Sequence, residues 1–164
     1  MAQQVQFRRG TTAEHSSFTG AVGEVTVDTD KDVVVVHDGS TAGGYPVAST
    51  AKSQSFTAAQ RGEITTLTSG ATVTPNFADS NNYTLTLGQN LTIANPSNRV
   101  AGQSGSIFLV QDGTGNRTAS WGSYWDFAGG TPPTLTTTGG AVDRIDYVVR
   151  SSTSIHAVAT LNYS

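Results

Sequence analysis

The chain has 164 residues, a mass of 17.0 kDa and a formal net charge of -3. Charged residues make up 13% of it, about half of the ~25% typical of soluble domains. Such a sequence offers no basic cluster for nucleic acid or an anionic membrane surface, so we expect neither as a partner. The absence of cysteine excludes disulfides and thiolate metal sites, and no apolar run approaches the ~20 residues of a membrane span.

Residues 1–48 predict a small unit of short strands joined by tight turns. We expect strands over 5–8, 23–28 and 33–36. The last of these is an unbroken run of four valines, which is typical of a strand covered on both faces. A unit this small usually needs a metal, a disulfide or a partner to be stable. Because cysteine and a convincing metal cluster are absent, we expect another copy of the chain to cover the valines.

Residues 49–62 are expected to connect this unit to the rest of the chain. They include the segment with the most helical potential. Thr57 would cap a short helix over 58–61, and Gly62 would end it.

From residue 63 to 164, strand-like segments recur at the spacing of an antiparallel β-sandwich or barrel, and the sandwich, of jelly-roll type, is the expected fold. Ser151–Thr153 is short enough to join the last two strands as a hairpin. No repeat of roughly 20 to 50 residues is visible, which argues against a solenoid. The expected strands are 64–67, 71–74, 83–87, 91–94, 106–110, 118–121, 134–136, 142–150 and 154–161.

Asp28, Asp30 and Asp32 have the alternating spacing of a calcium-binding loop. The glycine and the glutamate that such a loop needs are replaced by Val33 and Gly39. A solvated hairpin turn is therefore the preferred interpretation. The three histidines lie in no metal-binding pattern, so neither a metal nor a cofactor is expected.

The acidic residues of the C-terminal part offer little for catalysis. A glycosidase needs two neighbouring carboxylates. Asp143 and Asp146 are close in sequence, but their spacing on an expected strand places them on opposite faces. Asp112–Gly115 predicts a tight turn, because no phosphate-binding helix follows it. We therefore expect no catalytic residues and no enzyme activity.

Trp121, Tyr124 and Trp125 belong to the densest aromatic cluster of the chain. Large aromatic side chains most often fill a core or an interface between subunits, which is the first interpretation. The alternative is a recognition surface on which sugar rings stack.

Four segments carry a resemblance to a known family: Phe7–Glu14 (FRRGTTAE), Gly23–Asp28 (GEVTVD), His37–Thr41 (HDGST) and Tyr45–Pro46. In this order they resemble the N-terminal module of tailed-bacteriophage fibre and receptor-binding proteins. The later part is similar to a C-terminal module of phage and prophage virion proteins. The segments that carry this second similarity are 56–62, 95–96, 102–105, 111–115 and 121–127.

The first resemblance implies an intertwined, β-prism-like homotrimer formed by residues 1–48. The expected trimer interface consists of Phe7, Val25, Val27, Val33, Val34, Val35 and Val36. The overall expectation is an all-β chain in which this module precedes a connector, 49–62, and a β-sandwich domain, 63–164.

The resemblance implies a structural protein of the virion surface. Because the chain lacks a fibre shaft, a trimeric capsid-decorating (cement or head-fibre) protein that stabilises the capsid surface is the first hypothesis. Its partner would be the major capsid protein or another virion protein. The alternative is a tail-fibre or adhesin subunit that binds a host-surface glycan or receptor. The N-terminus lacks a signal-peptide pattern, so synthesis in the host cytoplasm without export is expected.

Overall fold

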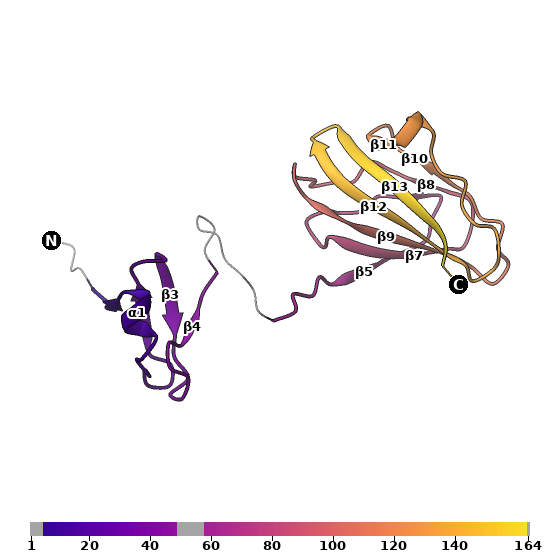
Figure 1. Cartoon of the computed structure of the whole chain (residues 1–164). Helices are drawn as coiled ribbons and strands as arrows, with labels where there is room; N and C mark the ends of the chain where they lie inside the picture. Colours follow the sequence, from indigo (N-terminus) through magenta and orange to yellow (C-terminus); the bar gives the residue numbers. More distant parts are fainter. Residues whose placement is uncertain (1–4, 49–57, 164) are drawn as a thin grey trace. The chain divides into compact units, whose positions relative to one another are not determined.

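A computed structural model of the chain describes residues 5–48 and 58–163. The chain divides into two compact units, residues 1–60 and 61–164, called here the N-terminal module and the C-terminal domain. Strands dominate both units, which confirms the all-β expectation (Figure 1). Most of the expected connector, residues 49–57, lies outside the described residues. No helix in the described ranges is long and apolar enough to cross a membrane.

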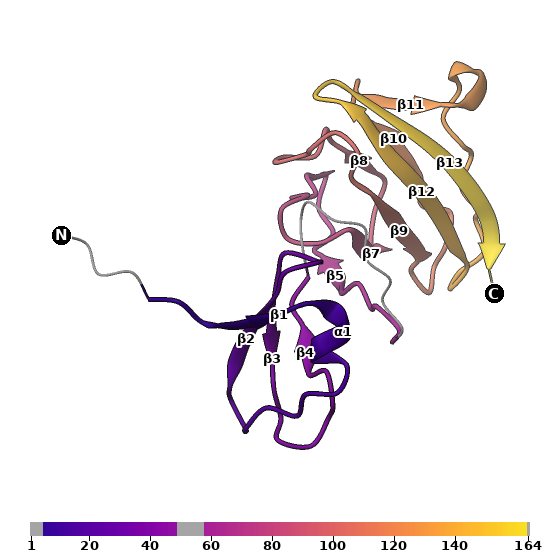
Figure 2. The same cartoon turned by 60° about the vertical axis from the view of Figure 1, so that its left-hand side comes forward.

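The N-terminal module is a four-stranded sheet with one short helix (Figure 2). Its strands lie in sequence order, with β1 parallel to β2, and with β2, β3 and β4 antiparallel. The elements are β1 (Arg8–Gly10), α1 (Thr12–His15), β2 (Val25–Asp28), β3 (Val33–Val36) and β4 (Tyr45–Pro46).

Helix α1 was not expected from the sequence. Thr11 and Glu14 form a capping box: the Thr11 N–H donates to Glu14 Oε2 over 2.7 Å, and the Glu14 N–H donates to Thr11 Oγ1 over 3.2 Å. The helix expected over 58–61 is wrong, because all four residues are non-helical and exposed; Thr57 lies outside the described residues. So short a helix forms only where packing stabilises it, and α1 gains this from the buried His15.

The valine run of β3 alternates between the two faces of the sheet. Val33 and Val35 are buried, at 5% and 2% exposure, whereas Val34 and Val36 are 42% and 40% exposed. A single copy of the module therefore covers only one face of β3, and the expected cover of the other face by another copy stays a prediction. Val33 and Val35 lie in the module's own core, because α1 and the segments beside it cover that face.

The C-terminal domain has two sheets. A six-stranded sheet has the order β11-β13-β12-β9-β7-β5, and a three-stranded sheet has the order β10-β8-β6. The strands are β5 (Ile64–Leu67), β6 (Thr72–Val73), β7 (Asn82–Leu87), β8 (Leu91–Ile93), β9 (Ser104–Gln111), β10 (Ala119–Trp121), β11 (Trp125–Phe127), β12 (Val142–Ser151) and β13 (Ser154–Tyr163), with a 3-10 turn, η1, over Ala128–Gly130.

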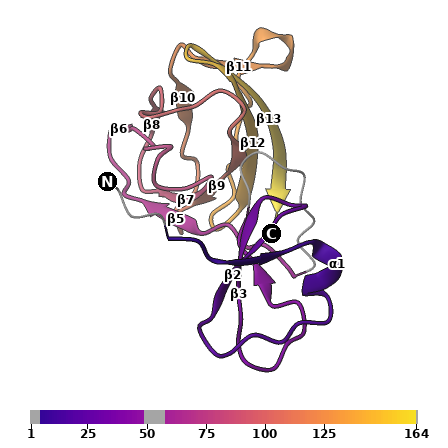
Figure 3. The same cartoon turned by 90° about the vertical axis from the view of Figure 1, so that its left-hand side faces the viewer.

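From β5 to β10, successive strands alternate between the two sheets, and each pairs in parallel with the strand two places earlier. The chain thus winds around the core in solenoid fashion, and Figure 3 shows the sheets on either side of it. The expected antiparallel pairing is wrong here, as is the argument against a solenoid. Unequal loops remove any fixed period from the sequence. The expected hairpin is confirmed, because β12 and β13 pair antiparallel.

Two smaller differences concern strands of the C-terminal domain. The strand expected over 134–136 is absent; Leu135 is buried, but the segment is an extended loop without a neighbouring ladder. Strand β11 was not expected, and it pairs in parallel with β13 along the edge of the large sheet.

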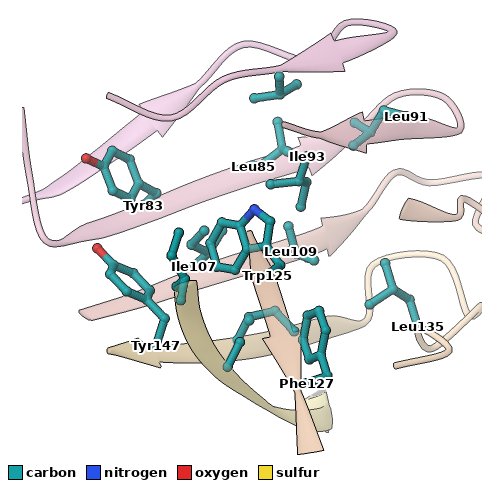
Figure 4. Packing of buried hydrophobic residues seen from close by; sticks show 14 of the residues in the cluster. Tyr83, Leu85, Leu91, Ile93, Ile107, Leu109, Trp125, Phe127, Leu135 and Tyr147 are labelled. Carbon is teal, nitrogen blue, oxygen red and sulfur yellow. The ribbon is translucent and has the colours of Figure 1, made fainter. Parts of the chain in front are cut away.

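One hydrophobic core fills the space between the sheets (Figure 4). Ile145, Tyr147 and Val149 face it from β12, as their alternation predicts. Aromatic rings stack at one end, where the Phe77 centroid lies 4.6 Å from that of Tyr147 and 5.9 Å from that of Tyr83. The core is completed from the three-stranded sheet by Val73, Leu91 and Ile93.

Candidate interaction surfaces

The inner face of the N-terminal module is unusually polar. His15 from α1, Thr26 from β2 and His37 after β3 are all buried there. Thr26 Oγ1 lies 2.8 Å from His15 Nε2 and 2.9 Å from His37 Nε2, so the hydroxyl bridges the two imidazoles. This hydrogen-bonded bridge joins the helix to the sheet.

The aspartate turn after β2 is engaged in hydrogen bonds within the module. Asp28 Oδ1 accepts from the N–H groups of Asp30 and Lys31, and its Oδ2 accepts from Thr12 Oγ1 over 2.7 Å. Burial of Asp28 opposes its ionisation, but these bonds outweigh burial and lower its pKa. The turn therefore anchors α1. Within the described residues, no group of three or more acidic, histidine or cysteine side chains could hold a metal.

The outer face of the same sheet is mostly apolar and partly exposed within the described residues, and it includes the charged Arg9 of β1, which is in register with Val27. The β2–β3 register places Val25 opposite Val36 and Val27 opposite Val34, and Tyr45 of β4 is opposite Val36. Residues in register point to the same side of a sheet. We call the four valines and Tyr45 the valine face.

The residues expected at the trimer interface thus divide into two groups. Val33 and Val35 are inside the module, whereas Val25, Val27, Val34 and Val36 lie on the valine face. Phe7 lies just before β1 and is 58% exposed. The structure makes the exposed set available for contact, and their place in an interface stays a prediction.

The aromatic cluster of the C-terminal domain belongs mainly to the core. Trp125 is 6% exposed, and its Nε1 donates to the Ala94 carbonyl over 3.1 Å. Trp121 packs edge-on against Trp125 and Phe127, with ring centroids 5.1 Å and 4.9 Å apart. The recognition alternative is therefore wrong for Trp125, because β11 turns that side chain inward.

Tyr124, like Trp121, is partly buried and packs against this core. It is half-buried, and the Arg99 guanidinium lies 4.6 Å from the centre of its ring. Arg99 Nε and a terminal nitrogen also donate to the carbonyls of Ser152 and Pro96. Since the cation occupies one side of the ring, Tyr124 offers little free area for a sugar.

Polar loops gather at the end of the domain where β5, β7 and β9 end, which we call the far end. Its described loops are 68–71, 88–90, 112–118 and the last part of the loop before β12, 136–141. Asp112 organises the third of these: it accepts from Arg117 Nε over 2.9 Å and from the N–H groups of Thr114 and Gly115. The Arg117 guanidinium is the main cause of the lowered pKa of Asp112. The two charged side chains of this loop are therefore paired with each other.

Asp143 and Asp146 lie on opposite faces of β12, as their spacing predicts. Asp143 is buried and accepts from the N–H and hydroxyl of Thr136 and from the Asn162 N–H. Asp146 lies on the other face, where it pairs with Arg144 over 3.0 Å. These two carboxylates cannot act on one substrate.

Two family models match separate parts of the chain. Residues 5–41 match the major tropism determinant N-terminal domain, and residues 72–148 match the putative phage tail fibre C-terminal domain. The first match lies in the N-terminal module and the second in the C-terminal domain.

A tail fiber receptor-binding protein from Bordetella phage BPP-1 is 69% identical over 48 residues, which are 29% of this chain and 13% of that protein. Solved structures of the Major Tropism Determinant M1 and I1 variants each show 71% identity over 27% of this chain and 12% of theirs, with a TM-score of 0.27. The chain thus spans only a small part of these relatives.

These matches favour the tail-fibre alternative over capsid decoration. Both family descriptions concern phage tropism or tail fibres, and neither names a capsid protein. The resemblance expected from the sequence is confirmed in both units, and the chain is a bacteriophage virion surface protein.

Proposed function

We propose that this chain is a receptor-binding subunit of a phage tail fibre, that it acts as a homotrimer, and that it binds a host-surface glycan. The observation that carries the proposal is the combination of matches in one chain. A receptor-binding protein is 69% identical over 48 residues, a tropism-determinant N-terminal domain matches residues 5–41, and a tail-fibre C-terminal domain matches residues 72–148.

The two units are proposed to have separate tasks. The identity to the receptor-binding protein covers 29% of this chain, so that protein and this one share a short segment. A shared segment suits a task common to both, such as assembly and attachment to the virion. The C-terminal domain would then provide the contact with the host.

Assembly is proposed to use the valine face. Val34 and Val36 remain 42% and 40% exposed in one copy, and Tyr45 is 58% exposed. A contiguous exposed apolar patch is typical of a protein–protein contact. Three copies packed through this face would bury it. The interface expected from the sequence would then lie on this side of the sheet.

Host contact is proposed to use the far-end loops. Asn, Thr, Ser, Gln and Gly dominate them, and Asp112 neutralises Arg117. Hydroxyl and amide groups both donate and accept hydrogen bonds, which suits neutral sugars. Binding without cleavage is the expected chemistry, because Asp143 and Asp146 face apart.

The proposal is tested first by location and then by binding. Antibodies to the C-terminal domain should label the tails of intact virions, and the purified protein should bind host cells and reduce phage adsorption. Labelling of the head would instead support capsid decoration and overturn the proposal.

A matched pair of variants tests the proposed surface. Gln89→Arg places a bulky cation in a far-end loop, whereas Val100→Arg places it in an exposed loop at the opposite end of the domain. Cell binding should fall for the first variant and persist for the second. Equal binding by both variants would contradict the assignment of the far end.

A further inference from the structure

The bridge formed by His15, Thr26 and His37 allows only one arrangement of hydrogens when both imidazoles are neutral. His15 Nδ1 lies 3.0 Å from the Thr11 carbonyl, which can only accept, so this nitrogen carries hydrogen. His15 Nε2 must then accept from the Thr26 hydroxyl. Because that hydroxyl has a single hydrogen, His37 Nε2 must donate to Thr26 Oγ1.

This arrangement leaves the other nitrogen of His37 as a buried lone pair. His37 is 2% exposed, and its Nδ1 has no hydrogen-bond partner. The ring is held tightly: a Cβ added to Gly44 would lie 2.7 Å from Nδ1, and one added to Gly20 would lie 2.6 Å from Cγ. The Phe18 ring packs edge-on, 5.2 Å away. The buried lone pair already has a cost in free energy, and a charged N–H at the same position, which would also lack an acceptor, costs more.

Charging His15 would disrupt the bridge itself. If Nε2 of His15 gained a hydrogen, Thr26 Oγ1 would accept from both imidazoles, and its own hydrogen would lose its partner. Protonation of His15 therefore breaks the hydrogen-bond pattern that joins α1 to the sheet, whereas protonation of His37 leaves the bonds in place and adds a buried charged N–H without an acceptor.

We propose that this bridge is sensitive to acid. It holds α1 against the sheet of the N-terminal module while both imidazoles are neutral, and it destabilises this packing when either imidazole gains a proton. This inference is independent of the proposed function, because it concerns the folding of a single module.

Charged groups around the bridge act in both directions. Arg8 and Arg9 line the same hollow as His15 and oppose a positive charge, whereas Glu14 in that hollow favours one. The Glu14 carboxylate is already bound to the N–H and hydroxyl of Thr11. The carboxylates nearest His37 and Thr26 along the chain are also engaged: Asp38 with Ser40 and Thr41, Glu24 with Arg8, and Asp28 with Thr12.

Three of these carboxylates stay ionised in mild acid. Backbone and side-chain hydrogen bonds from Thr11 lower the pKa of Glu14, and the N–H groups of Thr41 and Ser40 lower that of Asp38 far below its usual range. The pKa of Asp28 is lowered as well. Their contributions to stability are present above the ordinary carboxylate range and are lost only in stronger acid. Histidines, in contrast, change charge between about pH 5 and 8.

The test uses the full chain at about pH 7.5 and about pH 5, the range over which histidine titrates. Nitrogen-15 NMR of labelled histidines at the higher pH should find hydrogen on Nδ1 of His15 and on Nε2 of His37. After correction for the slower intrinsic exchange of amides at lower pH, acidification should lower the protection factors of residues 8–46 by about tenfold or more, the effect of one unpaired buried charge. The protection factors of residues 64–163 should stay unchanged.

A variant distinguishes the effect of acid on the bridge from a general sensitivity of the fold to acid. His37→Gln keeps a nitrogen donor near the Nε2 position and removes the imidazole, so it should reduce the loss of protection in acid. His156→Gln, at an exposed position of β13, is the matched control and should keep that loss of protection. If His37→Gln does not fold, the hydrogen positions and the exchange of the unchanged chain still decide. Other hydrogen positions, or protection that persists at about pH 5, would overturn the proposal.

Discussion

The substitution Val34→Asp tests whether the valine face is an interface between copies. Val34 points away from the module's core and is 42% exposed, and its neighbour on the face, Val36, is 40% exposed. Burying a whole valine is worth roughly 2 kcal/mol, so covering these exposed fractions adds roughly 0.8 kcal/mol for each. Over three copies the two valines contribute roughly 5 kcal/mol to the trimer. A carboxylate at position 34 removes this gain and adds the cost of a buried charge in every copy.

Light scattering coupled to size-exclusion chromatography measures the outcome. The unchanged chain should elute as a trimer, and Val34→Asp should elute as a folded or partly folded 17.0 kDa monomer. Val22→Asp is the matched control, because Val22 is 82% exposed in the loop before β2 and lies off the valine face. A trimer that survives Val34→Asp, or that dissociates equally with Val22→Asp, would refute the assignment.

Other predictions concern the C-terminal domain. Trp125→Ala should lower its free energy of unfolding by about 3–5 kcal/mol in urea, because a buried aromatic ring is lost; a loss below about 1 kcal/mol would show that the ring is exposed. Gly105→Ala should prevent folding at ambient temperature, seen as lost circular dichroism, because its Cβ would lie 1.6 Å from the Asn81 carbonyl oxygen. Burial raises the pKa values of Tyr147 and Tyr83. Their protonated forms therefore favour the folded state, and stability should fall above about pH 10; ultraviolet titration that shows all tyrosines ionising together before unfolding would contradict this.

Strands with clear alternation were predictable from the sequence. Tyr83, Leu85 and Leu87 alternate with polar residues on β7, and all three are fully buried. The winding of the chain between two sheets was not predictable, because alternation identifies the inward face of a strand but not its neighbours. Parallel pairing here depends on loops that return each strand to its place, and these differ in length from turn to turn.

The valine run shows a different limit. Four consecutive apolar residues predict burial on both faces, yet β3 is covered by its own chain on one face only. The sequence indicated that the second face of β3 must be buried by another partner. It did not show which valines lie on that face. The register with β2 decides this, since Thr26 lies opposite Val35 and Val27 lies opposite Val34.

The candidate site was partly visible in the sequence as well. The capping box at Thr11 and Glu14 is a recognised start signal for a helix, and it would have located α1 and, with it, His15. The bridge through Thr26 to His37 had no such signal, because it joins a helix, a strand and a loop that are brought together only by the fold. Trp125 was misplaced as an alternative recognition residue because nothing in the sequence marked β11 as a strand.

Folding and assembly of the N-terminal module are coupled by the composition of its core. Within the described part of the module, the buried apolar side chains of its core are Val33 and Val35, and the other buried side chains are polar. Two valines supply roughly 3–6 kcal/mol, whereas each ordered residue costs about 1–2 kcal/mol of backbone entropy. The hydrogen bonds of the bridge and of the aspartate turn fix which groups pair in the folded module, but each adds only about 1 kcal/mol to its stability. The valine face is the apolar surface that remains, so the module should gain much of its stability only when copies of the chain associate through it.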